Sequence, residues 1–213
     1  VWIIYGLFIG FFSTTSSGQL TDAQEIVTKA NIAAYYAGED GRSAARMLIV
    51  DGNDNRQQRQ FTLLRKDVED AGDQRYLVVF SRPADIRGTV FRVEKHVGRD
   101  DDRWLYLPAL DLVKRIAAGD KRTSFVGSHF FYEDISGRGL AEDEHHLIDT
   151  TDEYYLIEST PKDPNSTEFA LFRTWIDRET LLPMRSEYAR ASGEIYRRME
   201  VTKVEVINGY PTG

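Results

Sequence analysis

The sequence predicts an α+β fold in which a strongly curved antiparallel sheet is accompanied by an N-terminal helix and short central helices. Three observations support this fold class. Strand-like segments recur about every ten residues along most of the chain, a helical pattern precedes them, and the strand rhythm stops in the middle. Because sheets with so many strands curl strongly or close, we expect a concave apolar face.

The helical pattern begins close to residue 20. Thr21, with Gln24 three residues later, has the spacing of a capping box, and apolar residues recur at helical spacing as far as Ala37, just before Gly38. Most of this apolar face consists of small side chains, which bury little area each. The helix therefore fits either a plain packing element or a movable cover for the sheet.

Strand-like segments with turn residues between them follow the helix. They are residues 45–51, 60–66, 75–80, 89–95, 103–107, 112–116, 154–159, 169–176, 184–189 and 195–206. Phe91 and Val93 alternate with charged neighbours, as in a sheet with one solvated face. Other segments are apolar on both faces, so we expect helices or a ligand to cover the concave side.

The strand pattern stops between residues 117 and 149. Charged residues and glycines surround a compact aromatic block at 124–134 in this part of the chain. We expect short helices or ordered loops here, lying over one end of the sheet together with the N-terminal helix. A concave apolar sheet beneath such a lid is a pocket for hydrophobic ligands.

The first residues are typical of an export signal. VWIIYGLFIGFF carries no charge and precedes a run of small polar residues, which fits a secretory h-region with cleavage near Gly18. As a helix it would span about 18 Å, short of the roughly 30 Å needed to cross a membrane. We therefore expect residues 1–18 to be a signal-peptide remnant and 19–213 to be one domain; the alternative is a buried N-terminal strand or helix.

Composition narrows the function classes. The net charge is −7 and the basic residues are spread along the strands, which argues against a nucleic-acid partner. The chain has no cysteine, so disulfides and thiolate chemistry are excluded. No nucleophile motif occurs either, so we expect neither an enzyme nor a cofactor.

The polar motifs favour structural roles. DGNDN at 51–55 lacks the glycine and glutamate of a calcium loop and predicts a hairpin turn, and RDDDR at 99–103 predicts a solvated turn. EDEHH at 142–146 contains two adjacent histidines beside three carboxylates. Adjacent residues of a strand point to opposite faces, so these histidines do not favour a metal site. His129 is interpreted as a loop histidine rather than a base.

Several segments together carry a family resemblance. They are PADIRGT at 83–89, WLYLPAL at 104–110 with the basic pair that follows, SFVGSHFFYED at 124–134, and WIDRETLLPMRSEY at 175–188. In order and spacing, about residues 20–208 resemble the LolA-like superfamily, in particular its outer-membrane lipoprotein-sorting proteins. This chain departs from the family pattern at His129, where Asp is usual, and at Phe131, where a small or polar residue is usual. Such proteins usually continue beyond Gly213, so we expect a C-terminally truncated domain.

The resemblance implies a half-open antiparallel β-barrel with a helical lid, located in the periplasm. It also implies a carrier, monomeric, that takes acylated lipoproteins or lipids from an inner-membrane transporter as donor toward an outer-membrane acceptor. The alternative is a periplasmic sensor or interaction protein of the same fold that regulates envelope stress through a partner protein. An enzyme acting on a lipid or glycan ranks third.

A carrier needs a cavity as apolar as the membrane interior, because each buried methylene is worth about 0.8 kcal/mol. The candidate cavity residues are the aromatic and aliphatic side chains expected to point inward from strands and lid: Phe91, Val93, Tyr106, Phe125, Phe130, Tyr132, Leu156, Trp175 and Tyr188. A residue of this kind at strand spacing belongs to the ordinary core more often than it contacts a ligand.

Overall fold

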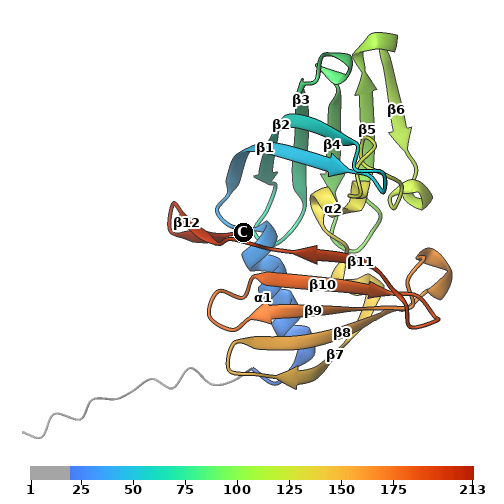
Figure 1. The fold of residues 1–213 in the computed structure, drawn as a ribbon. Coiled ribbons are helices and arrows are strands. Elements are labelled where there is room, and N and C mark those ends of the chain that lie inside the picture. Colours follow the sequence, from blue (N-terminus) through green and yellow to red (C-terminus); the bar gives the residue numbers. More distant parts are fainter. Residues whose placement is uncertain (1–19) are drawn as a thin grey trace, which may run out of the picture.

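The computed structural model describes residues 20–213, which form two curved antiparallel sheets and a small hairpin (Figure 1). The first sheet has six strands in the order β1-β2-β3-β4-β5-β6. The second has five in the order β11-β10-β9-β8-β7, and β12 pairs with β13. The sheets do not close into a barrel, which confirms the α+β half-open architecture. The predicted signal peptide at residues 1–18 lies outside the described residues.

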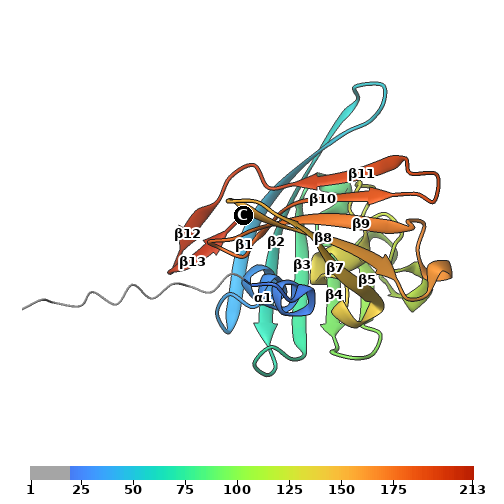
Figure 2. The same ribbon diagram turned by 90° about the horizontal axis from the view of Figure 1, so that it is seen from below.

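The strands follow one another as meanders. The six-stranded sheet comprises β1 (Asp40–Val50), β2 (Arg56–Asp67), β3 (Gln74–Arg82), β4 (Val90–Lys95), β5 (Asp102–Leu107) and β6 (Leu112–Ile116). The five-stranded sheet comprises β7 (Asp143–Thr150), β8 (Tyr154–Pro161), β9 (Leu171–Asp177), β10 (Pro183–Ala189) and β11 (Ile195–Glu200). The hairpin is β12 (Glu205–Ile207) and β13 (Tyr210–Thr212). The paired ends of β1 and β2 project away from the body (Figure 2).

Helix α1 (Ala23–Tyr35) lies across the five-stranded sheet (Figure 1). Its N-cap is Asp22, whose carboxylate accepts a hydrogen bond from the Glu25 amide at 2.7 Å, so the predicted Thr21 cap was wrong by one residue. The positive end of the helix dipole also stabilises a carboxylate at this position. The helix stops at Tyr35, short of Ala37, because the Arg65 guanidinium binds the backbone carbonyls of both residues.

The concave face of the six-stranded sheet is filled by the aromatic block of the central segment. Phe125 is fully buried there, with its ring centroid 5.4 Å from Phe91 and 5.7 Å from Phe80. Tyr132 packs beside it, 5.0 Å from Phe91. Protein side chains, and not a ligand, therefore cover this half of the fold.

The central segment contains the expected short helices, but it ends earlier than predicted. Helix α2 (Tyr132–Ser136) lies within it, and the short 3-10 turns of the chain are η1 (Ala84–Ile86), η2 (Pro108–Leu110), η3 (Ala118–Asp120), η4 (Leu140–Glu142) and η5 (Pro164–Ser166). Strand β7 begins at Asp143, inside the stretch where no strand was predicted. Its sequence is rich in polar residues because one face is exposed, and its pairing with β8 holds it extended.

The two predicted polar turns differ in outcome. Residues 51–55 join β1 to β2, and the Asp51 carboxylate accepts the amides of Asn53 and Asn55 at 2.8 and 3.0 Å, which confirms the hairpin turn. The solvated turn at 99–103 was wrong in its second half. Asp101 and Arg103 form a buried ion pair of 2.6 Å, because Asp101 packs against the central segment and accepts the Ser136 hydroxyl.

Among residues 20–213, no helix has the length and apolar character needed to cross a membrane.

Candidate functional site

A cavity of about 650 Å³ lies between α1, residues 129–139 and the inner face of the five-stranded sheet. Ligand sites in proteins commonly have volumes of about 300–1,000 Å³. The volume of this cavity is within that range. Its lining residues place it on the five-stranded sheet, in the other half of the molecule from the filled aromatic core.

Strand pairing arranges the sheet wall of the cavity in rows. The row nearest the central segment is Ser159, Phe172, Tyr188 and Arg197; the next is Ile157, Thr174, Ser186 and Met199; the third is Ile176, Met184 and Val201. Charged and aromatic groups therefore gather at one end, and aliphatic and thioether groups at the other. The wall changes from polar to apolar along the strands.

The opposite wall is the face of α1 that carries small residues. Ala30 and Ala34 line the cavity, with Val27 about one turn before Ala30 and Tyr35 directly after Ala34. Short side chains at these positions leave open the space that leucine or phenylalanine would fill. The alanine-rich face was visible in the sequence, where it fitted either a plain packing helix or a movable cover for the sheet.

Two of the predicted cavity residues line this cavity. Phe130 reaches it from the central segment with 41% of its surface exposed, and Tyr188 reaches it from β10. Their contact with a ligand stays a prediction.

The other predicted residues lie elsewhere. Phe91, Val93, Phe125 and Tyr132 belong to the core of the six-stranded sheet. The hydroxyl of Tyr106 donates to Asp111 at 3.1 Å near the end of that sheet.

Leu156 and Trp175 pair with each other across β8 and β9, and their neighbours Ile157 and Thr174 line the cavity. Because successive strand residues face opposite ways, Leu156 and Trp175 point out of the inner face. The indole of Trp175 lies 4.6 Å from the Arg185 guanidinium.

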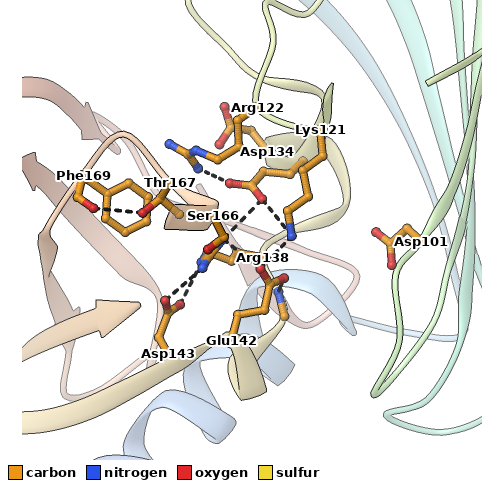
Figure 3. A network of polar contacts seen from close by, with 12 residues as sticks. Asp101, Lys121, Arg122, Asp134, Arg138, Glu142, Asp143, Ser166, Thr167 and Phe169 are labelled. Carbon is orange, nitrogen blue, oxygen red and sulfur yellow. Dashed lines mark hydrogen bonds and ion pairs between the residues drawn. The ribbon is translucent and has the colours of Figure 1, made fainter. Parts of the chain in front are cut away.

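A buried network of charges holds the central segment to the five-stranded sheet (Figure 3). Its centre is Glu133, which is 2% exposed and pairs with Arg122. Arg122 also binds Glu168 in the loop before β9, at 2.7 Å. Arg138 binds Asp143 of β7 at 2.8 Å. Sequence reasoning did not identify this network, because its residues follow no regular spacing and Glu168 lies 46 residues from Arg122.

A second link crosses the polar end of the cavity. Arg197 of β11 forms a two-pronged ion pair with Asp134, and its guanidinium lies 4.4 Å from the ring of Phe131. Arg122 lies over the same ring at 4.7 Å. The ring of Phe131, which departs from the family pattern, thus contacts two guanidinium groups. Their carboxylate partners are Glu133 and Asp134.

The histidines of the cavity region are not arranged as metal ligands. Burial lowers the pKa of His145, whose ring nitrogens lie 2.8 Å from the Ser159 hydroxyl and 3.1 Å from the Leu140 carbonyl. Within residues 20–213 the grouping that could reach one cation is Glu94, His96 and Asp102, away from the cavity. Protein groups already contact the His96 ring nitrogens.

Comparisons with known proteins agree with this fold. A family model described as an uncharacterized protein matches residues 72–213. A DUF1329 family protein from Desulfovibrio piger is 30% identical, with a TM-score of 0.79 over 89% of this chain and 81% of that chain. A putative outer membrane lipoprotein-sorting protein domain from Vibrio parahaemolyticus is 25% identical, with a TM-score of 0.76 over 88% of this chain and 80% of that chain. The chain belongs to the DUF1329 family.

The predicted resemblance to LolA-like proteins is confirmed at the level of the fold, because a LolA superfamily protein from Nitrosomonas europaea shares it. That protein has a TM-score of 0.64 at 19% identity, over 90% of this chain and 81% of that chain. No curated protein matches the sequence.

Because of the ion pair between Arg122 and Glu168, the free energy of unfolding of this LolA-like protein should fall at acid pH. Burial alone would raise the pKa of Glu168, but the hydrogen bonds from Arg122, a backbone amide and the Tyr196 hydroxyl, with the charge of Arg122, together outweigh it, and the pKa falls to about 2. A carboxylate with a depressed folded-state pKa contributes stability above its unfolded value, and this contribution disappears as the pH falls toward 2. Urea unfolding from pH 7 to 2.5 should show this loss, and Glu168→Gln should make the curve flatter below pH 4.5. An identical pH dependence in both proteins would contradict the link.

Gly137 allows the central segment to approach α1 closely. Its φ of +79° and ψ of 151° belong to a backbone region that is essentially restricted to glycine, and a Cβ there would lie 2.8 Å from the Tyr35 ring. We expect Gly137→Ala to lower the free energy of unfolding by about 2–4 kcal/mol. The control is Gly127→Ala, which has φ +75° but open space around its Cβ. Equal losses in urea unfolding would show that the contact with Tyr35 costs nothing.

Proposed function

We propose that this LolA-like protein is an exported periplasmic carrier that binds acyl chains of lipoproteins or lipids in its cavity and passes them toward the outer membrane. The cavity of about 650 Å³ beneath the alanine face of α1 carries the proposal. The likeness to a putative outer membrane lipoprotein-sorting protein domain supports it.

The aliphatic end of the cavity suits an acyl chain. Ile157, Ile176, Met199 and Val201 line it from the sheet, and Val27 lines it from α1. Since methionine side chains adapt to irregular shapes, such a wall accepts chains of different length. A donor at the inner membrane and an acceptor at the outer membrane belong to the same proposal, because an acyl chain leaves a bilayer only for a comparably apolar place.

The test is the content of the purified protein. Native mass spectrometry should show bound lipid, and after its removal the protein should bind a fluorescent fatty acid. Apo protein together with no dye binding would favour the alternative, a protein-binding sensor of the same fold.

Phe130 and Tyr132 provide a matched pair of variants. Phe130 is 41% exposed at the cavity, so Phe130→Asp should weaken dye binding about tenfold or more while the melting temperature changes little. Tyr132 is 7% exposed within the aromatic core, so Tyr132→Asp should unfold the protein. Unchanged dye binding by Phe130→Asp would place the acyl chain away from residues 129–139.

A further inference from the structure

The polar end of the cavity is not built for an anionic headgroup. Each arginine in the cavity wall already has a carboxylate partner among residues 20–213: Arg138 pairs with Asp143, Arg197 with Asp134, and both Arg185 and Arg198 with Glu187. A carboxylate or phosphate of a ligand would have to compete with these partners. The recognised group is therefore to be sought among the uncharged polar atoms.

Two tyrosine hydroxyls at this end of the cavity are free. Tyr35 and Tyr188 both line the cavity, and neither hydroxyl has a hydrogen-bond partner within the described part of the chain. Two tyrosines outside the cavity show the contrast: the hydroxyl of Tyr36 donates to the Gly72 carbonyl at 2.8 Å, and that of Tyr196 donates to Glu168 at 2.8 Å. Neither hydroxyl is among the fully buried side-chain atoms that lack a partner, so each remains open and can donate a hydrogen bond to an acceptor atom of a ligand in the cavity.

The two hydroxyls share one environment. Burial is the main cause that raises the pKa of Tyr35, and Asp134 and Tyr188 add to it. Burial also raises the pKa of Tyr188 to about 12. Both groups are therefore protonated at neutral pH and able to donate. Asp134 is not a free acceptor for them, because Arg197 and the Phe131 amide, at 2.6 Å, already bind its carboxylate.

A neutral oxygen acceptor beside an acyl chain is the group that matches two such donors. We infer that Tyr35 and Tyr188 bind the carbonyl oxygen of an ester- or amide-linked acyl chain, so that the linkage lies at the Tyr188 end of β10. The chain would then run along the strand toward Met184, about 13 Å away at about 3.3 Å per residue. This inference rests on the proposed carrier function and adds the chemical group that the cavity recognises.

The experiment uses two ligands that differ only in the carbonyl. One is 1-monopalmitoylglycerol and the other is 1-O-hexadecylglycerol, its ether analogue, each competing with a fluorescent fatty acid for the delipidated protein. We expect the ester to bind about five- to fiftyfold more tightly than the ether, since one hydrogen bond is worth roughly two- to tenfold in affinity.

Tyrosine variants connect the preference to the two hydroxyls. Tyr35→Phe and Tyr188→Phe should each weaken ester binding about two- to tenfold and leave ether binding unchanged. Tyr106→Phe is the control, because its hydroxyl bonds Asp111 away from the cavity. Equal binding of ester and ether to the wild-type protein would overturn the inference, and so would an equal loss for both ligands in the variants. Binding of neither ligand would contradict the carrier function itself.

Discussion

Replacing Arg122 by alanine should lower the free energy of unfolding by about 3–5 kcal/mol, the usual loss when one partner of a buried ion pair is removed. Glu133 would be left with only 3% of its side chain exposed and without its nearest cation. Burial lowers the pKa of Arg122, but its contacts with Glu168 and Glu133 outweigh burial and raise the pKa above its usual value. Chemical denaturation at pH 7 measures the loss.

The matched control is an ion pair that is open to solvent. Arg173 and Glu158 pair at 2.8 Å with 45% and 25% of their side chains exposed, so Arg173→Ala should cost no more than about 1 kcal/mol. If both alanine variants lose the same stability, the network around Glu133 does not hold the central segment. Arg122→Met, which keeps much of the packing on Phe131 and Phe169, separates the lost charge from the lost contact area.

The alternation of apolar and charged residues made the six-stranded sheet predictable. Phe91 and Val93 face the core as expected, and WLYLPAL turns at Pro108 between β5 and β6. Local pattern suffices there because each of these strands pairs with its sequence neighbours. The same pattern missed β7, whose exposed face removes the apolar repeat.

The cavity was less predictable, for two physical reasons. Strand β9 has apolar residues on both faces, so alternation does not indicate whether Trp175 or its neighbours Thr174 and Ile176 face inward. The partner of the aromatic block is also decided by tertiary packing. Phe125 could have covered either sheet, and it fills the face of the six-stranded one.

Ion pairs between residues far apart in the chain could not be predicted from the sequence. Arg197 and Asp134 are 63 residues apart, and both carry charges that look solvated in a sequence. Their burial follows only once β11 and the central segment meet at the cavity. The residues that close the site are therefore those that a local pattern is least able to identify.

Ala34→Phe should reduce acyl-chain binding by about two orders of magnitude or more. Ala34 lines the cavity from α1, and a phenyl ring there would occupy space that an acyl chain needs. Excluding about four methylenes from the cavity would cost the ligand roughly 3 kcal/mol, at about 0.8 kcal/mol for each. The affinity of a fluorescent fatty acid, measured by titration, gives the loss.

The matched control lies on the other face of the same helix. Ile32 is 42% exposed and is not part of the cavity wall, so Ile32→Phe should leave dye affinity unchanged. The melting temperature of Ala34→Phe should not fall, because the ring enters existing space and displaces no core residue. Unchanged affinity in a folded Ala34→Phe protein would mean that acyl chains bind elsewhere. The alanine face of α1 buries less apolar area than a face with large side chains would, so it holds the helix less tightly. An increased melting temperature together with lost binding would therefore show that the space beneath α1 is kept open for a ligand at the expense of stability.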